Sequence, residues 1–234
     1  MNKADIIFDV LKSDFGFKGA EGSVRFNLKD FNITVEQNNI IGNILEEWLA
    51  KWIVFRGFDC IHNTKQESPD FWLNREDLTA DWLEVKSFTG SPNFDIAAFR
   101  SFINLIIDKP YKLQSKYLLI KYSMADGIVT IDDIWLKKVW EISCTSDRFP
   151  IKVQYKNKTI VNIRPATWYS ANSTPVFKSL EHFLAALEQT IYKYHDTNHL
   201  AETWLDKLKK SYQDFYGVLL DVPRWNDIKE LYVK

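Results

Sequence analysis

The sequence is poor in residues that break or cross-link a chain. Its 234 residues include 8 glycines, 7 prolines and 2 cysteines, with no glycine-rich phosphate loop, internal repeat or low-complexity tract. Scarce glycine and proline beside 15% aromatic residues exclude a disordered chain and predict a large folded core. Cys60 and Cys144 lie in apolar stretches without metal-ligand spacing, so we expect buried free thiols in a reducing compartment.

Long apolar runs are also missing. No stretch approaches membrane-spanning length, and the N-terminal residues interleave acids with apolar residues, unlike a signal peptide. We therefore expect a cytoplasmic protein without a membrane partner. The length fits one domain, residues 1–234, with a core at about 38–140, a basic segment at about 145–175 and C-terminal helices at about 179–234.

Positive charge is unevenly distributed along the chain, although the net charge is only −1. Residues 91–180 carry 13 Lys and Arg against 7 Asp and Glu, whereas residues 1–90 carry 10 against 15. A basic middle segment predicts that a polyanion is bound there. Ordinary variation among solvated lysines is the alternative interpretation.

The stretch from Ser68 to Phe88 contains two short apolar runs separated by a charged turn, a pattern that predicts an antiparallel β-hairpin. In its second strand, Glu84 and Lys86 fall on one face. Asp70, at the start of the first strand, brings a second carboxylate next to Glu84. Because buried charges are costly unless paired or bound to a metal, these three groups predict a hard-cation site with a base beside it.

Pro69-Asp70, a gap of 13 residues and then Glu84-Val85-Lys86 resemble the PD-(D/E)xK signature of type II restriction endonucleases and related resolvases. The acid-x-Lys pattern recurs at Asp227-Ile228-Lys229, but only the Glu84 copy follows a Pro-Asp pair. The resemblance covers roughly residues 40–125. It implies an α/β fold with a restriction-endonuclease-like core, in which helices flank a central mixed sheet, extended here by an extra β-hairpin and C-terminal helices.

The same resemblance implies a magnesium site. Asp70, Glu84 and the Val85 carbonyl would hold one or two Mg²⁺ ions, and Lys86 would orient or activate water. The helix before the catalytic sheet often supplies one more carboxylate in this family. Here G-N-I-L-E-E assigns that role to Glu46, with Glu47 as the alternative. The products expected from the resemblance carry 5′-phosphate and 3′-hydroxyl ends.

Other parts of the chain show clear periodicity. Residues 40–55 have an apolar stripe at helical spacing, and a short strand is expected at 59–63. We expect His62 to be an ordinary strand histidine, because no second His or Cys lies near it. Further helices are predicted at 2–12, 179–194 and 200–215, a hairpin at 24–35 and strands at 116–122 and 128–135.

The segments after the proposed catalytic hairpin carry side chains that typically contact DNA. Residues 96–107 predict a helix that begins after Asp95 as its N-cap. Residues 151–164 predict a β-hairpin that turns at Asn157-Lys158. A surface hairpin without a binding role is the alternative. The predicted DNA-binding residues are Arg100, Lys152, Lys156, Lys158, Arg164, Trp168 and Asn172.

The leading hypothesis is a Mg²⁺-dependent type II restriction enzyme that acts as a homodimer on a short, roughly symmetric site in double-stranded DNA. A resolvase-like or repair nuclease is the second hypothesis, although the roughly 110 residues after the core favour a sequence reader. The third is a DNA-binding protein with a degenerate nuclease fold. The sequence gives neither the recognition site, the cut position nor the dimer interface.

Overall fold

The computed structural model describes residues 2–65 and 67–232. Contacts along the backbone divide the chain into two compact units. The first comprises the residues up to Ser91 together with Ser115–Lys137, and the second comprises Pro92–Gln114 and the residues from Lys138 onward. The predicted core at 38–140 thus contributes residues to both units. Its role as the core of one nuclease domain stays a prediction.

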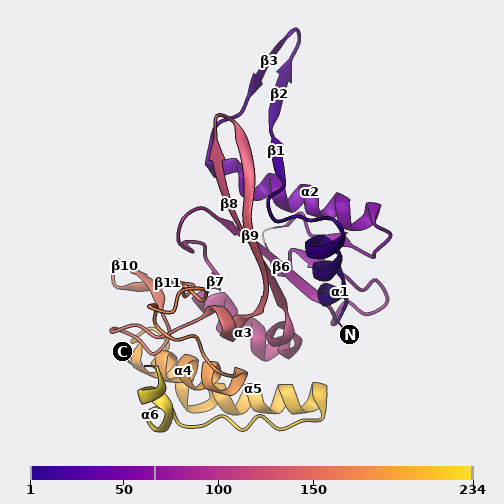
Figure 1. Ribbon diagram of the computed structural model, residues 1–234. Helices are drawn as coiled ribbons and strands as arrows, with labels where there is room; N and C mark the ends of the chain where they lie inside the picture. Colours follow the sequence, from indigo (N-terminus) through magenta and orange to yellow (C-terminus); the bar gives the residue numbers. More distant parts are fainter. Residues whose placement is uncertain (1, 66, 233–234) are drawn as a thin grey trace. The chain divides into compact units, whose positions relative to one another are not determined.

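The first unit is a mixed sheet with helices, as the sequence predicts (Figure 1). Its elements are α1 (Lys3–Asp9), the π-helix η1 (Val10–Asp14), β1 (Glu21–Ser23), β2 (Arg25–Leu28), β3 (Phe31–Thr34), the 3-10 turn η2 (Asn38–Ile40), α2 (Ile41–Phe55), β4 (Ile61–His62), β5 (Phe71–Trp72), β6 (Trp82–Phe88), β8 (Lys116–Ala125) and β9 (Ile128–Lys138).

Six strands form the main sheet of this unit in the order β1-β9-β8-β6-β5-β4. Strand β6 runs parallel to β8 and antiparallel to β5, which confirms the predicted hairpin and makes the sheet mixed. The predicted hairpin at 24–35 is also confirmed. It forms a separate two-stranded sheet, β2-β3, that projects away from the six strands (Figure 1).

Helices α1 and α2 pack their apolar residues against the sheet. Leu45, Leu49 and Ile53 of α2 share one buried core with Leu83 and Val85 of β6. Burying each such side chain contributes about 1.5–3 kcal/mol to stability. Because side chains alternate along a strand, this packing leaves Glu84 and Lys86 on the opposite face of β6.

Helix α2 approaches β6 closely at Gly42, in its first turn. A Cβ atom at this position would lie 2.9 Å from the Ser87 Oγ, closer than real Cβ contacts allow. Glu46 follows four residues later, on the same face of the helix. At the other end, Gly57 adopts a φ of 83° after the helix, as expected for a glycine C-cap.

The second unit contains a small sheet and the C-terminal helices (Figure 1). Its three strands lie in the order β10-β11-β7. Its elements are β7 (Ala97–Ala98), α3 (Phe99–Asp108), η3 (Pro110–Gln114), η4 (Val139–Ile142), β10 (Val153–Lys156), β11 (Thr159–Ile163), α4 (Leu180–Lys193), η5 (Asn198–Leu200), α5 (Ala201–Tyr216), α6 (Trp225–Ile228) and η6 (Lys229–Leu231).

A predicted hairpin turn in this unit is confirmed, and a predicted helix cap is wrong. Strands β10 and β11 pair antiparallel around Asn157 and Lys158, whose φ angles of 49° and 64° suit a two-residue turn. The predicted helix cap at Asp95 is wrong. Residues 97–98 pair with β11 instead, so the helix begins at Phe99 after an uncapped Ala98.

Candidate active site

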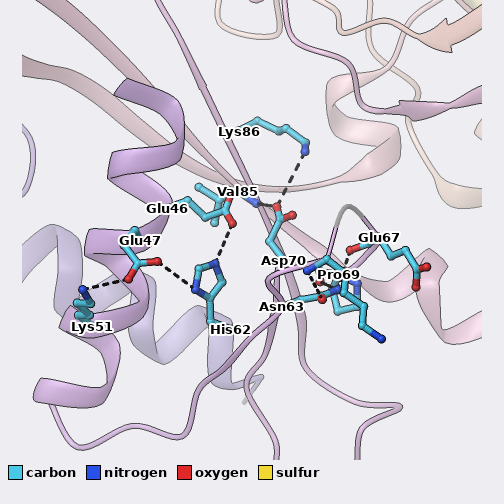
Figure 2. Close-up of polar contacts among 11 residues, drawn as sticks. Glu46, Glu47, Lys51, His62, Asn63, Glu67, Pro69, Asp70, Val85 and Lys86 are labelled. Atoms are coloured by element: carbon cyan, nitrogen blue, oxygen red, sulfur yellow. Dashed lines mark hydrogen bonds and ion pairs between the residues drawn. The ribbon is translucent and has the colours of Figure 1, made fainter. Parts of the chain in front are cut away.

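The β5–β6 hairpin brings the two predicted carboxylates together. Its register pairs Phe71 with Leu83, so one step further along the ladder places Asp70 beside Glu84. The Val85 N–H donates a hydrogen bond of 2.7 Å to Asp70 Oδ2. This bond fixes the Asp70 carboxylate against the middle of β6 (Figure 2).

Lys86 completes the predicted trio. Its Nζ lies 3.9 Å from Asp70 Oδ2, and Figure 2 shows the two side chains pointing toward each other. The Asp70 and Lys86 side chains keep 19% and 25% of their surface exposed. Both groups are therefore held by the fold and still reachable from solvent.

Glu84 is the most buried member of the site, with 4% of its surface exposed. The Ser68 hydroxyl donates to Glu84 Oε1 over 2.5 Å, which orients the carboxylate. On the other side of β6, the parallel register places Tyr117 of β8 opposite Glu84. Burial, followed by the charge of Glu84, raises the pKa of the fully buried Tyr117, so its phenol stays neutral.

The two glutamates of α2 differ in their surroundings. Glu46 has 28% of its side chain exposed and lies near enough to Asp70 to raise the pKa of that carboxyl. Glu47 is 53% exposed and pairs with Lys51 at 3.0 Å, and the hydrogen bond from Lys51, followed by its charge, lowers the pKa of Glu47. Glu46, the first choice from sequence, therefore shares the surroundings of Asp70, whereas Glu47 pairs with Lys51, and the role of Glu46 as the additional acid stays a prediction.

Negative charge accumulates around Asp70. Burial raises the pKa of Asp70 to about 6, and the charges of Glu84 and Glu46 add to the rise. Lys86 and the Val85 N–H oppose it without cancelling it. A carboxylate that resists ionisation beside two further acids is a site where a cation would be strongly favoured.

The donor set fits a small hard cation. Among residues 2–65 and 67–232, no three His, Cys, Asp or Glu side chains form a preassembled cluster that could hold a metal ion. Mg²⁺ does not require such a cluster, because it keeps several waters and is usually bound by one or two carboxylates. Asp70 and Glu84, with excess negative charge, meet that smaller requirement.

We expect Asp70→Asn to stabilise the metal-free protein above pH 6. The Asp70 pKa of about 6 exceeds the 3.8 of an unperturbed carboxyl, so the folded state binds this proton more tightly than the unfolded chain. Stability of the native protein is therefore lost as the pH rises from about 3.8 to about 6, and asparagine avoids this loss. The expected gain is about 3 kcal/mol well above pH 6 and vanishes only below about pH 3.8, where both states are protonated.

Urea unfolding of both proteins in EDTA, from about pH 3 to about pH 8, measures the difference in unfolding free energy across both pKa values. A difference that does not change across this range would contradict the assignment of the charge conflict to Asp70.

The predicted DNA-binding residues lie in the second unit, and several contact their own chain. Arg100 is exposed on α3 and donates to the Asp196 carbonyl at 3.0 Å. Lys152 donates to the Pro165 carbonyl at 2.9 Å. The half-buried ring of Trp168 packs near Phe94 and Tyr169. Lys156, Lys158 and Asn172 are exposed.

Arg164 has a structural contact that the sequence did not predict. Its guanidinium donates to the Asp95 carboxylate and to the Asn93 carbonyl. Only 22% of its side chain is exposed. The following residues Pro165 and Ala166 are buried, although this stretch has too irregular a pattern to predict a core. Arg164 therefore fastens the 93–95 loop to the end of β11.

Comparisons with known proteins all indicate one family. A family model described as NgoBV restriction endonuclease matches residues 1–232. The type II restriction enzyme NlaIV of Neisseria lactamica is 42% identical over 238 aligned positions, covering 99% of this chain and 98% of that protein. The type II restriction enzyme NgoBV of Neisseria gonorrhoeae is 40% identical over 158 positions, covering 65% of this chain and 89% of that protein.

The solved structure of the NlaIV restriction endonuclease has the same fold. It superposes with a TM-score of 0.94 at 41% identity, covering 99% of this chain and 96% of that one. Within the described part of the chain, no helix has both the length and the apolar character needed to cross a bilayer.

Proposed function

This chain belongs to the NgoBV restriction endonuclease family and is a type II restriction enzyme, and on that premise we propose that it cleaves double-stranded DNA in a Mg²⁺-dependent reaction at the Asp70 site. The observation that supports this proposal most is that Glu84 and Lys86 lie beside Asp70, whose carboxyl pKa is raised to about 6. This is the charge distribution expected of a cation site before its cation binds.

Each residue has a distinct role in the proposed reaction. Asp70 and Glu84 hold the cation, with the Val85 carbonyl and Glu46 as further ligands. The Val85 N–H and the Ser68 hydroxyl keep the two carboxylates oriented. When bound, one or two Mg²⁺ ions would supply Lewis acidity and lower the pKa of water.

Lys86, whose Nζ lies 3.9 Å from Asp70 Oδ2, would act on the attacking water and the phosphate. Its ammonium orients the attacking water and stabilises negative charge that develops on the phosphate. A protonated lysine does both without losing its proton, so we prefer these roles to that of a general base. The products would carry 5′-phosphate and 3′-hydroxyl ends, as the sequence resemblance implies.

The substrate proposal is a short, roughly symmetric duplex site bound by a homodimer, because two-fold symmetric proteins match symmetric half-sites. We also expect the protein to act in the cytoplasm.

Incubation with plasmid and phage DNA, with and without Mg²⁺, tests the function. Discrete fragments that need the ion, followed by sequencing of their ends, would give the recognition site and cut position. A smear, or no cutting at all, would contradict the proposal.

We expect the double substitution Lys156→Ala, Lys158→Ala to weaken DNA binding without changing sequence preference. Both side chains are exposed at the β10–β11 turn, where lysines typically hold phosphates. Loss of two phosphate contacts should reduce the slope of log K against log salt by about 2. Fluorescence anisotropy with labelled duplex at several salt concentrations, without Mg²⁺, measures this.

The control is Lys210→Ala, an exposed lysine of α5 that pairs with Asp214. It should leave the slope unchanged. An unchanged slope in the double variant would remove both turn lysines from the interface.

Arg164→Ala is expected first to loosen the 93–95 loop, because Arg164 donates hydrogen bonds to Asp95 and Asn93 of that loop.

A further inference from the structure

His62 lies between the two glutamates of α2, although its sequence context predicted only an ordinary strand histidine. Its Nε2 is 2.9 Å from Glu46 Oε1, and its Nδ1 is 3.5 Å from Glu47 Oε2 (Figure 2). The contact joins residues 16 positions apart, from a helix and a strand. Its two nitrogens thus face two carboxylates with different surroundings.

The position of the His62 ring is fixed by the sheet. Strand β4 pairs with β5 so that His62 lies opposite Phe71, the residue that follows Asp70. The two rings also contact each other, with centroids 5.1 Å apart, and Phe71 is fully buried. The next residue continues the pairing, since the Asn63 N–H donates to the Asp70 carbonyl at 2.8 Å. The imidazole is therefore anchored to the segment that carries Asp70.

Of the two glutamates, Glu46 is the one whose orientation by His62 would affect the site around Asp70. Glu47 already pairs with Lys51 and is mostly solvated, whereas Glu46 is less exposed and raises the pKa of Asp70. Figure 2 shows the Glu46 carboxylate extending from α2 between His62 and Asp70. One of its oxygens is engaged by His62 Nε2, which leaves the other for a second contact.

We propose that His62 is a positioning residue that holds the Glu46 carboxylate on the side of Asp70, so that its second oxygen would close onto the cation when the cation binds. The inference rests on the proposed function, in which Glu46 is a ligand. A glutamate has three rotatable side-chain bonds, and a fixed hydrogen bond removes much of that freedom before the cation arrives. Ligating carboxylates are commonly held in this way, and loss of the outer partner typically costs 10–100-fold in metal affinity or activity.

Two substitutions separate the hydrogen bond from ring packing. His62→Leu keeps an apolar side chain against Phe71 but removes the donor. His62→Gln keeps an N–H donor at a similar reach. Mn²⁺ titration of the DNA-free protein, with the free ion followed by electron paramagnetic resonance, measures cation binding directly. The Mg²⁺ concentration that gives half-maximal cleavage is the second measurement.

We expect His62→Leu to weaken Mn²⁺ binding about 10–100-fold and to raise the half-maximal Mg²⁺ concentration in parallel. His62→Gln should stay within a few-fold of the native protein, and the melting temperature of both variants should be nearly unchanged. Because His62 acts through Glu46, His62→Leu should add almost nothing in a Glu46→Gln background. Glu76→Gln, which neutralises an exposed acid away from His62, is the control and should leave Mn²⁺ binding unchanged.

Native Mn²⁺ affinity in His62→Leu, or a full additional loss in the Glu46→Gln background, would overturn the inference. So would a His62→Gln variant as defective as His62→Leu, because that result would assign the effect to the ring. Failure of the proposed function has a different signature, namely cleavage that survives Asp70→Asn.

Discussion

Replacement of Asp70 by asparagine is expected to reduce DNA cleavage at least about a thousandfold, equivalent to about 4 kcal/mol of transition-state stabilisation. Asparagine has nearly the shape of aspartate and can still accept the hydrogen bond from the Val85 N–H. It lacks the charge that attracts the cation to the position beside Glu84. Single-turnover cleavage of plasmid DNA at saturating Mg²⁺ measures the loss.

A matched control is Glu76→Gln, which neutralises an exposed acid in the turn between β5 and β6. It should cut at the native rate. The expected rise in stability of Asp70→Asn above pH 6 excludes unfolding as the cause of the lost activity. Cleavage within about threefold of native in Asp70→Asn would place the chemistry elsewhere in the protein.

The second large effect is expected for Lys86→Met, which should lower the cleavage rate constant about 100–1,000-fold while leaving DNA affinity nearly unchanged. The ammonium is 3.9 Å from Asp70 and partly exposed, so it can act on a water or phosphate beside the carboxylates. Methionine keeps a long side chain without the charge. Rate constants come from single-turnover cleavage, and affinity comes from anisotropy without Mg²⁺.

A third variant, Lys86→Arg, distinguishes the roles of this residue. Arginine remains charged and cannot act as a base. If Lys86 orients water and stabilises charge, Lys86→Arg should recover part of the rate lost in Lys86→Met. Equal loss in both variants would instead favour proton abstraction by Lys86. Lys18→Met, which removes an exposed partner of Asp133, is the control and should cut normally.

The sequence predicts that Asp70, Glu84 and Lys86 lie together, and the structure confirms this proximity because local rules determine it. Alternation along one strand sets the faces of Glu84 and Lys86, and one hairpin register places Asp70 beside them. The choice of Glu46 instead comes from the resemblance of G-N-I-L-E-E to the helix that precedes the catalytic sheet in the nuclease family. Ser68, His62 and Tyr117 were missed for the opposite reason. Their roles depend on contacts between separate elements, and nothing in their local sequence distinguishes them from other serines, histidines and tyrosines.

The second unit shows how tertiary pairing overrides local preference. Residues 96–98 fit a helical pattern, yet the Ile96 N–H donates to the Ile163 carbonyl, and Ala97 and Ala98 form a strand with β11. Asp95, an apparent cap, is thereby placed next to Arg164. The same contact gives a predicted DNA-reading arginine an internal partner. Charge and periodicity alone cannot reveal such a pairing, because it joins residues 69 positions apart.

The close approach at Gly42 has a consequence for how this protein can vary. A Cβ atom at position 42 of α2 would meet the hydroxyl of Ser87, one residue beyond Lys86, and the same helix face carries Glu46 one turn later. Alanine at position 42 would therefore require the Ser87 hydroxyl to rotate away or the helix to shift. A shift of the helix would move Glu46 relative to Lys86, so Gly42 limits the spacing between these two groups although it belongs to neither.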